Sequence, residues 1–374
     1  MLLKSFFKIH RMRKLYIVYL YLSVLSSQNL LLKGQFWSVN QSFEGILENK
    51  PSIQSQLGYI PTLSLLKTFS NERTLDLEWA HRLTGTNSYQ DTFNSYDRPY
   101  RRWIRYSSNN VEARLGLQKI TFGPAQILRP LSWFDTINIS DPTGQTDGVE
   151  ALRLRYFPND ILSLWTWGMN SDSDNYSYGF RTELMTVFGD WGITYHRDEN
   201  VNSHQIGLLP IVASGSNSRF ALDYRFDGII GFWFEGSSIL FDKKSYDLAT
   251  IGADYTLPIF NGILITSETM HINTRSITGV KTGSYPNINN TYSVIMGSMP
   301  VGLLHQVMAL IQWDWQRSIS NYYLRWGVTY DRLSFNFSLS VNSSIDNEKN
   351  YQQYLSKNLE GFGNILDFTI IYNH

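Results

Sequence analysis

The sequence predicts an all-β fold, a transmembrane antiparallel β-barrel of 16 to 18 strands, and three observations support this prediction. Thirteen stretches between residues 149 and 373 alternate apolar and polar side chains. Tight turns and longer polar loops join these stretches in turn. Aromatic residues form 15% of the chain, while the mean hydropathy is only −0.24. A membrane barrel combines these features because each strand has one lipid-facing and one water-facing side.

The alternation is clearest over residues 333–342, LSFNFSLSVN, where every odd position is apolar and every even position is polar. Side chains of a strand point alternately to its two faces, so this segment has one apolar and one polar face. A soluble β-sandwich also has alternating strands. We favour the barrel because outward faces such as Val307, Ile311 and Trp313 are very apolar, and because hairpins with alternately short and long connections are typical of barrels.

The connections divide into two sets, one for each end of the barrel. Six tight turns, with aromatic residues beside them, lie at 158–160, 189–190, 227–228, 258–262, 300–302 and 331–332. Longer polar loops lie at 170–175, 198–218, 273–290 and 343–363. Outer-membrane barrels keep short turns on the periplasmic side, and aromatic residues gather at the membrane interfaces. We therefore expect the tight turns, and both chain termini, on the periplasmic side.

Five further strands are predicted upstream, at 36–47, 53–68, 73–83, 98–106 and 111–119. They raise the best count to 18, an even number as expected for a single-chain bacterial barrel. Pro51 and Pro61 interrupt the two strands nearest the N-terminus, and proline is confined to strand edges and bulges. Without these two strands the count is 16. The last strand carries Tyr372 near the C-terminus and resembles the signal that barrel-insertion machinery reads, although Asn373 and His374 follow it.

Residues 1–34 are predicted to be a signal peptide, and residues 35–374 to be the barrel. Five basic residues between Lys4 and Lys14 precede an apolar run from Leu15 to Leu25, which is the order typical of a secretory signal. A transmembrane anchor is the alternative, but the apolar run is short for a helix that spans a bilayer. Cleavage is expected after Gly34, or earlier near Ser27.

Composition excludes several classes of partner and site. Residues 1–34 hold six of the 32 basic and none of the 32 acidic residues, so the remainder has 26 against 32, a net charge of −6. An acidic chain gives no reason to expect nucleic acid as a partner. The chain has no cysteine, which excludes disulfides, thiolate metal sites, a cysteine nucleophile and a lipid-bearing cysteine.

Residues 120–148 form the one long connection that is not simply polar. Three prolines exclude a continuous strand or helix, yet seven large apolar residues occur: Ile127, Leu128, Leu131, Trp133, Phe134, Ile137 and Ile139. Such a loop has to bury itself, and the lumen of a wide barrel offers the space. We expect a constriction or plug loop in the lumen, anchored by Pro130, Trp133 and Phe134. The alternative is a loop that caps the barrel mouth or packs on a partner.

Basic residues concentrate beside this loop. Between positions 97 and 155 there are nine basic and six acidic residues, whereas the chain without its predicted signal peptide is acidic overall. Alternation puts these charges opposite apolar neighbours, and charges facing lipid are costly, so they should point inward. The predicted pore-lining residues are Arg102, Arg105, Glu112, Arg114, Arg129, Asp135, Arg153 and Arg155. They can attract anions and set selectivity, or pair with nearby carboxylates and anchor the loop.

Several motifs between residues 112 and 149 carry a family resemblance: EARLGLQKI at 112–120, Phe122-Gly123, RPLSWFD at 129–135, Asp141-Pro142 and TDGV at 146–149. They resemble uncharacterised outer-membrane barrels of Bacteroidetes-type bacteria. More loosely, they are similar to porin and alginate-export barrels, in which a strand with a Gly-Arg-Gln type of end leads into a loop bearing Pro and Asp. The resemblance implies a membrane barrel with a folded-in loop and names no substrate.

No catalytic residues, metal site or cofactor are predicted. His271 with Ser276 comes nearest to a hydrolase pair, and residues 196–199 come nearest to an acid–histidine protease site. Neither has the surroundings that such chemistry needs. The acidic residues at 172–174 and 346–348 lack the spacing of a calcium loop, and no nucleotide-binding motif occurs.

These features favour an outer-membrane, porin-like channel for passive diffusion of small polar or anionic solutes. The alternative is a non-conducting barrel that serves as a scaffold or partner subunit in an export or assembly complex. The expected partners are outer-membrane lipid and the solute, without nucleic acid, while homo-oligomers and other outer-membrane partners stay open. The expected location is the outer membrane of a Gram-negative bacterium.

Overall fold

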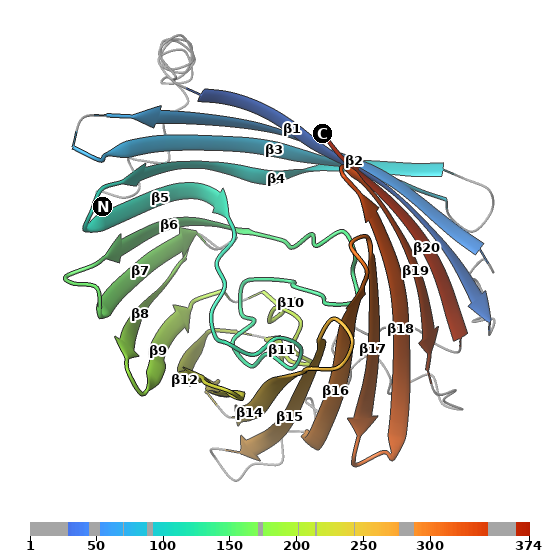
Figure 1. The fold of residues 1–374 in the computed structure, drawn as a ribbon. Helices are drawn as coiled ribbons and strands as arrows, with labels where there is room; N and C mark the ends of the chain where they lie inside the picture. Colours follow the sequence, from blue (N-terminus) through green and yellow to red (C-terminus); the bar gives the residue numbers. More distant parts are fainter. Residues whose placement is uncertain are drawn as a thin grey trace.

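The computed structural model is a closed barrel of antiparallel strands with a long loop in its interior (Figure 1). It describes residues 29–44, 53–69, 71–87, 93–170, 175–200, 202–213, 215–242, 244–276, 288–342 and 364–374. Within these ranges, no helix has the length and apolar character needed to cross a membrane.

Eighteen strands form the wall, and two short strands form a hairpin inside it (Figure 1). The wall strands are β1 (Asn29–Glu44), β2 (Ile53–Thr68), β3 (Thr74–Asn87), β4 (Phe93–Ser107), β5 (Val111–Gln118), β6 (Val149–Tyr156), β7 (Leu162–Asn170), β8 (Tyr176–Thr186), β9 (Gly189–Asp198), β12 (Asn217–Asp227), β13 (Gly231–Leu240), β14 (Lys244–Leu257), β15 (Ile263–Ser276), β16 (Asn289–Val301), β17 (His305–Asp314), β18 (Ile319–Tyr330), β19 (Leu333–Val341) and β20 (Asn364–Asn373). The hairpin strands are β10 (His204–Gln205) and β11 (Val212–Ala213). Neighbouring wall strands pair antiparallel, β9 pairs with β12, and β1 closes the ring by pairing with β20.

The predicted fold class and the best count of 18 strands are confirmed. The thirteen predicted downstream strands correspond to β6–β9 and β12–β20. Pro61, which made the second strand uncertain, lies inside β2 at the point where the pairing with β3 is interrupted, between Tyr59↔Leu83 and Thr62↔Ala80. The interruption explains why a residue without an N–H is tolerated there.

The N-terminal strand is longer than expected. β1 begins at Asn29, and Gly34 exchanges two backbone hydrogen bonds of 2.9 Å with His374. Cleavage after Gly34 would therefore remove six residues of a paired strand, whereas the earlier position near Ser27 would leave β1 whole. Residues 1–28 lie outside the described part of the chain, so the signal peptide itself stays a prediction.

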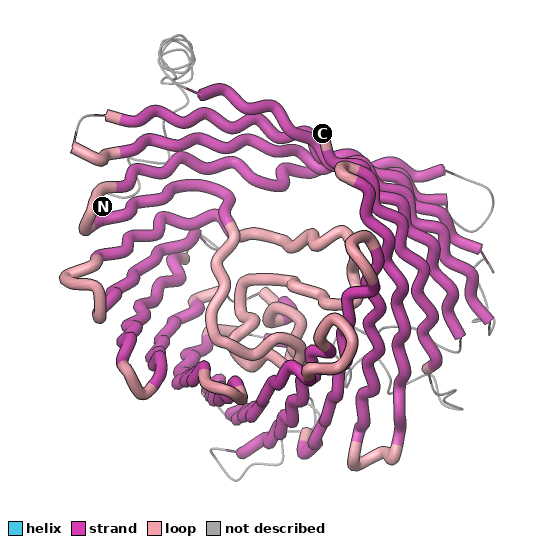
Figure 2. The backbone as a smooth tube through the Cα atoms, in the orientation of Figure 1, coloured by secondary structure: helices cyan, strands magenta, loops and turns pink. Residues whose placement is uncertain are grey.

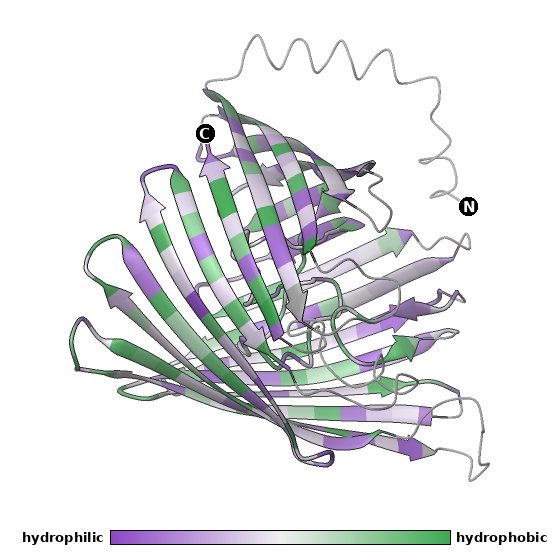
Figure 3. Ribbon diagram, turned by 90° about the vertical axis from the view of Figure 1, so that its right-hand side faces the viewer, coloured by the Kyte–Doolittle hydropathy of each residue, from purple (hydrophilic) through white to green (hydrophobic). Residues whose placement is uncertain are grey.

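The short turns gather at one end of the barrel, as the alternation predicted (Figure 3). Each of them joins an even-numbered strand to the strand that follows it in the wall. At the β8–β9 turn, Gly189 has a φ of 118°, and a Cβ there would lie 2.5 Å from the Arg225 carbonyl oxygen. The other end carries the longer connections, of which 171–174, 277–287 and 343–363 lie outside the described residues.

The barrel core lies in the lumen. On β13, Trp233, Glu235, Ser237 and Ile239 are buried, and the residues between them are more exposed. The inward faces of the following strands also carry apolar residues, including Leu248, Met270, Ile272, Val294 and Leu310. This half of the inner wall is therefore built to pack against something inside the barrel, and Figure 2 shows the loop segments that fill it.

Candidate pore and the loops folded into it

The 120–148 loop leaves β5 and crosses the lumen to the opposite wall (Figure 2). There the Glu268 carboxylate of β15 accepts the backbone N–H groups of Gln126 at 2.7 Å, Ile127 at 3.0 Å and Leu128 at 2.6 Å. The Glu235 carboxylate of β13 accepts those of Ala125 at 2.7 Å and Leu131 at 3.3 Å. Two buried wall carboxylates thus satisfy five backbone donors of a loop without regular structure.

The loop also has an internal ion pair. The Arg129 guanidinium donates to both Asp135 oxygens, at 2.5 and 3.1 Å, and both side chains are buried. Burial alone would lower the pKa of Arg129, but the hydrogen bonds and charge of Asp135 outweigh burial and raise that pKa. Arg129 therefore stays charged, and the pair fixes the fold of the loop.

The expected anchors Pro130, Trp133 and Phe134 are buried in the lumen. The Trp133 indole N–H donates to the Pro130 carbonyl at 3.0 Å. The Phe134 ring lies 4.8 Å from the His196 ring of β9 and 6.0 Å from the Trp167 ring of β7, centroid to centroid. These contacts join the loop to the wall on the β7–β9 side.

The loop returns along a third part of the wall. The Tyr323 hydroxyl of β18 donates to the Ser140 carbonyl at 2.9 Å, and the Gln35 amide of β1 donates to the Thr143 carbonyl at 3.3 Å. Near its end, Asp147 pairs with Arg98 of β4 at 2.6 Å. The loop is therefore attached to several separate parts of the wall. It crosses the lumen and does not simply lie against one side.

A second inward segment was not predicted. Residues 198–218 were expected to be a polar outer loop, but β10 and β11 fold into the lumen beside the 120–148 loop (Figure 1). Ile206, Leu209 and Ile211 are buried in the same apolar cluster. The contact is close: a Cβ on Gly207, whose φ is 53°, would lie 1.5 Å from the Ser132 carbonyl oxygen. The largely apolar run IGLLPIVA at 206–213, within that polar loop, was the available signal.

Four of the predicted arginines lie together on the inner wall, towards the short-turn ends of β4, β5 and β6. Arg105, Arg114 and Arg153 are direct cross-strand partners. Like charges placed opposite one another are unfavourable unless they are compensated. Glu112 compensates three of them, with nitrogen–oxygen distances of 2.6 Å to Arg153, 3.5 Å to Arg105 and 3.8 Å to Arg114.

Arg155 differs from its neighbours. Its guanidinium carbon lies 3.9 Å from the Trp165 ring centroid and 4.9 Å from that of Phe157. No carboxylate of the described residues lies within ion-pair distance of it.

The neighbouring arginines have further acidic partners. Asp76 pairs with Arg105, and Glu78 lies close enough to Arg114 to interact with it electrostatically. We call Arg105, Arg114, Arg153 and Arg155 the arginine band.

The structure places Arg102 on the outer face of β4. Arg101 and Arg105 face the lumen, while Arg102 lies on the opposite face together with the exposed Ile104. Arg102 pairs with Glu150 at 2.6 Å, and the side chains of both partners are more than half exposed. We therefore do not retain Arg102 as a pore-lining residue. A β-bulge in β4, opposite Ala80 and His81, lets the nearby Arg98 and Arg101 both point inward although they are three residues apart.

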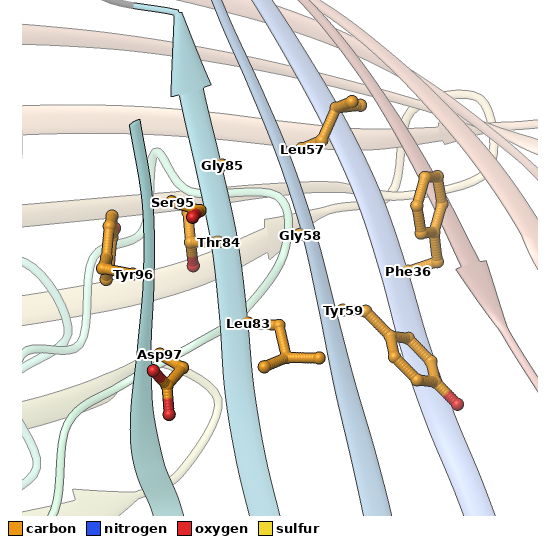
Figure 4. Close-up of a pocket in the computed structure, with 10 residues that line it drawn as sticks. All are labelled: Phe36, Leu57, Gly58, Tyr59, Leu83, Thr84, Gly85, Ser95, Tyr96 and Asp97. Atoms are coloured by element: carbon orange, nitrogen blue, oxygen red, sulfur yellow. The ribbon is translucent and has the colours of Figure 1, made fainter. Parts of the chain in front are cut away.

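Two hollows lie beside these features. A cavity of about 380 Å³ lies between the 120–148 loop, the β10–β11 hairpin and the neighbouring strand ends, with Asp135, Asp198, His204 and Arg219 among its lining residues. A groove of about 470 Å³ crosses β1–β4, and Phe36, Leu57, Leu83, Gly85 and Ser95 are among the residues that line it (Figure 4). Leu57 and Leu83 are exposed on the outer face, so this groove does not belong to the candidate pore.

The residues with the nearest approach to catalytic patterns have structural partners. His271 Nδ1 lies 3.0 Å from the Thr291 hydroxyl. His196 is buried, and its Nδ1 accepts the Trp167 indole N–H at 3.3 Å, while Asp198 binds Arg219 and His204. Among the described residues, no group of three or more His, Asp or Glu side chains could hold a metal ion.

Comparison with known proteins shows similarity of fold alone. No protein-family model and no curated sequence matches the chain. Acinetobacter baumannii OccAB1 superposes with a TM-score of 0.59 at 8% identity, over 93% of this chain and 97% of that one. Salmonella typhi OmpF, in a complex with daunomycin, gives 0.52 at 10% identity, over 92% and 97%. A Rhodopseudomonas blastica porin triple mutant gives 0.51 at 12% identity, over 92% and 100%.

The three neighbours are bacterial porins or similar barrels, so the chain has a porin-like fold. They do not bear on the resemblance to Bacteroidetes-type or alginate-export barrels, which stays a prediction.

Proposed function

We propose that this chain is an outer-membrane channel through which small polar solutes, anions among them, diffuse passively. The observation that carries the proposal is the loop tied across the lumen to Glu268, with the arginine band on another part of the same inner wall. A loop that narrows the lumen beside a cluster of fixed charges is an arrangement that can select solutes by size and charge.

The outer surface supports a membrane location. Leu152 and Leu154 on β6, Ile193 on β9, Leu222 on β12 and Ile251 on β14 all expose large apolar side chains. Such a surface is costly in water and favourable in lipid, and a closed barrel leaves no unpaired strand edge. Because β1 starts and β20 ends at the end with the short turns, both termini are placed in the periplasm in this proposal.

Planar-bilayer conductance tests the proposal. We expect the purified barrel to give stable single-channel steps in KCl, with a larger step after residues 122–147 are replaced by a short Gly-Ser linker. A barrel that inserts yet conducts in neither form contradicts the channel proposal. Under an imposed KCl gradient, the reversal potential reports whether the arginine band favours chloride.

A non-conducting scaffold is the second candidate, and one observation favours it. The β10–β11 hairpin and the 120–148 loop form a packed apolar cluster with the inward faces of β13–β17, with Ile120, Leu131, Ile239 and Ile272 fully buried. That part of the lumen is a core, and passage depends on the part beside the arginine band. Absence of conductance together with stable co-purification of other outer-membrane proteins would favour the scaffold.

A further inference from the structure

Four neighbouring short turns carry apolar residues at their tips. Taken in order around the barrel, they are Val187 and Phe188 (β8–β9), Ile229 and Ile230 (β12–β13), Ile259 and Phe260 (β14–β15), and Leu303 and Leu304 (β16–β17). Phe260 is 87% exposed, Val187 89%, Ile229 90% and Leu303 101%. We call these four turns the apolar turn arc; hydrophobic turns lie side by side along the left edge of Figure 3. A contiguous exposed apolar surface of this kind marks a contact with another phase or molecule.

The other side of the same rim is polar. The β2–β3 turn contains Glu72, the β4–β5 turn contains Asn109 and Asn110, and the β18–β19 turn contains Asp331 and Arg332. These turns are also neighbours, because β19, β20, β1 and β2 follow one another in the ring. The β6–β7 turn between the two arcs is mixed. The rim is therefore divided into two arcs of opposite character.

The charged residues next to the apolar turn arc point into the barrel. Arg225 shares its strand face with the buried Asp223, pairs with Asp227 at 2.7 Å and approaches Asp254 at 4.0 Å. Asp190 is the cross-strand partner of Arg225. These charges therefore occupy the lumen side of the rim, and the tips of the arc form an apolar surface that no charge of this cluster interrupts.

We propose that the apolar turn arc inserts its tips into the periplasm-facing leaflet of the outer membrane, whereas the polar turns extend into water. The inference rests on the proposed membrane location. The occupant is lipid because the arc continues an outer surface that is itself apolar, through residues such as Leu184, Ile193, Phe226 and Phe232.

Strand length supports the same assignment for the first two turns of the arc. β8, β9, β12 and β13 contain 11, 10, 11 and 10 residues, close to the roughly 9 to 11 residues that cross a bilayer as a tilted strand. The turns at their ends consequently lie at the edge of the hydrocarbon.

The absence of native cysteine makes a depth measurement direct. Ile229→Cys and Leu303→Cys report on the tips, Glu72→Cys and Asp331→Cys on the polar turns, and Leu222→Cys on the outer face of a wall strand. Each variant is labelled with bimane and reconstituted in vesicles of phosphatidylethanolamine and phosphatidylglycerol, with and without nitroxide-labelled lipid. We expect the lipid quencher to act severalfold more strongly on the two tip labels than on the two polar-turn labels, and aqueous iodide to show the reverse order.

The Leu222→Cys label separates the two possible failures. If lipid does not quench it, the barrel is not in the bilayer, and both the membrane location and this inference are wrong. If lipid quenches it while the tip labels respond to iodide as the Glu72→Cys label does, the location stands and the inference is overturned. The tips have few packed neighbours, and heat-dependent migration on a denaturing gel verifies that each variant is folded.

Discussion

The Glu268 carboxylate of β15 accepts the backbone N–H of Leu128 at 2.6 Å, although 140 residues separate the two in sequence. The same carboxylate binds two further loop N–H groups and the Trp233 indole N–H, the latter at 3.1 Å. A single buried side chain therefore holds one end of the lumen-crossing loop against the wall.

Replacing this carboxylate should release the loop. In Glu268→Gln, an amide that both donates and accepts faces a row of N–H donors, and we expect docking of the loop to weaken by about 1.5–3 kcal/mol, the size of a hydrogen bond to a charged group. The measurements are proteolytic cleavage within residues 120–148 and single-channel conductance, and both should rise. Thr250→Val, which removes one neutral hydrogen bond of 2.9 Å to the Leu128 carbonyl, is the matched control and should cost about 1 kcal/mol. Equal behaviour of the two variants would contradict the anchor role of Glu268.

The Arg129–Asp135 pair should be more costly to break than to replace. Asp135→Asn leaves a buried guanidinium without a counter-charge, and we expect a loss of about 3–5 kcal/mol in the stability of the loop fold. Replacing both partners, with Arg129→Met and Asp135→Leu, should recover part of that loss. Hydrogen exchange of the loop amides is the measurement, and the prediction is wrong if the double variant exchanges faster than the single one.

The arginine band should favour anions through Arg155 in particular, because this guanidinium has no carboxylate within ion-pair distance among the described residues. A unit charge about 10 Å from a passing ion contributes about 0.4 kcal/mol at the dielectric constant of water. Arg155→Gln should therefore change the permeability of each ion by about twofold, towards cations. The reversal potential under a KCl gradient measures the change. Arg102→Gln, on the outer face, is the control and should leave it unaltered.

Docking of the β10–β11 hairpin should depend on pH through His204. Its hydrogen bond to Asp198, 3.1 Å long, raises the pKa of His204 above its usual value. A raised pKa means that this stabilisation is complete below about pH 6.5, the ordinary pKa of histidine, and is lost as the pH rises through the higher folded-state value. The protection of the amides in residues 202–213 against hydrogen exchange, taken relative to the intrinsic exchange rate at each pH, should therefore fall above neutral pH. His204→Gln should remove this pH-dependent change, because the titrating group is gone. A pH profile that is the same in the variant would contradict the assignment of the change to His204.

The close contact of the two inward segments is testable at Gly207. Gly207→Ala places a methyl group against the Ser132 carbonyl oxygen in a backbone region that is unfavourable for alanine, and we expect a loss of about 1–3 kcal/mol or more in hairpin docking. Gly215→Ala is the control, since its φ is also positive, 93°, but a Cβ there meets nothing within 4 Å. Thermal unfolding of the two variants isolates the steric part; equal losses would mean that the contact with Ser132 is unimportant.

The wall of this barrel could be predicted from the amino-acid sequence. The alternation along segments such as 333–342, and the tight turns between them, predicted the barrel, its 18 strands and the end at which the turns gather. These features are local: the face to which a side chain points depends on its position along its own strand, and a turn depends on a few adjacent residues. The prediction that Arg102 and Arg105 both line the pore was wrong at Arg102, because the two are three residues apart with no bulge between them and therefore lie on opposite faces of β4.

The interior depends on contacts that form only in the folded barrel. The sequence predicted that the 120–148 loop is buried, because its apolar residues require it, but could not identify Glu235 and Glu268 as the groups that hold it. It also did not reveal the inward β10–β11 hairpin, or that Arg155 lacks a carboxylate partner among the residues described. Each of these contacts joins residues that come together only when the ring of strands closes, so no periodicity along the chain encodes them.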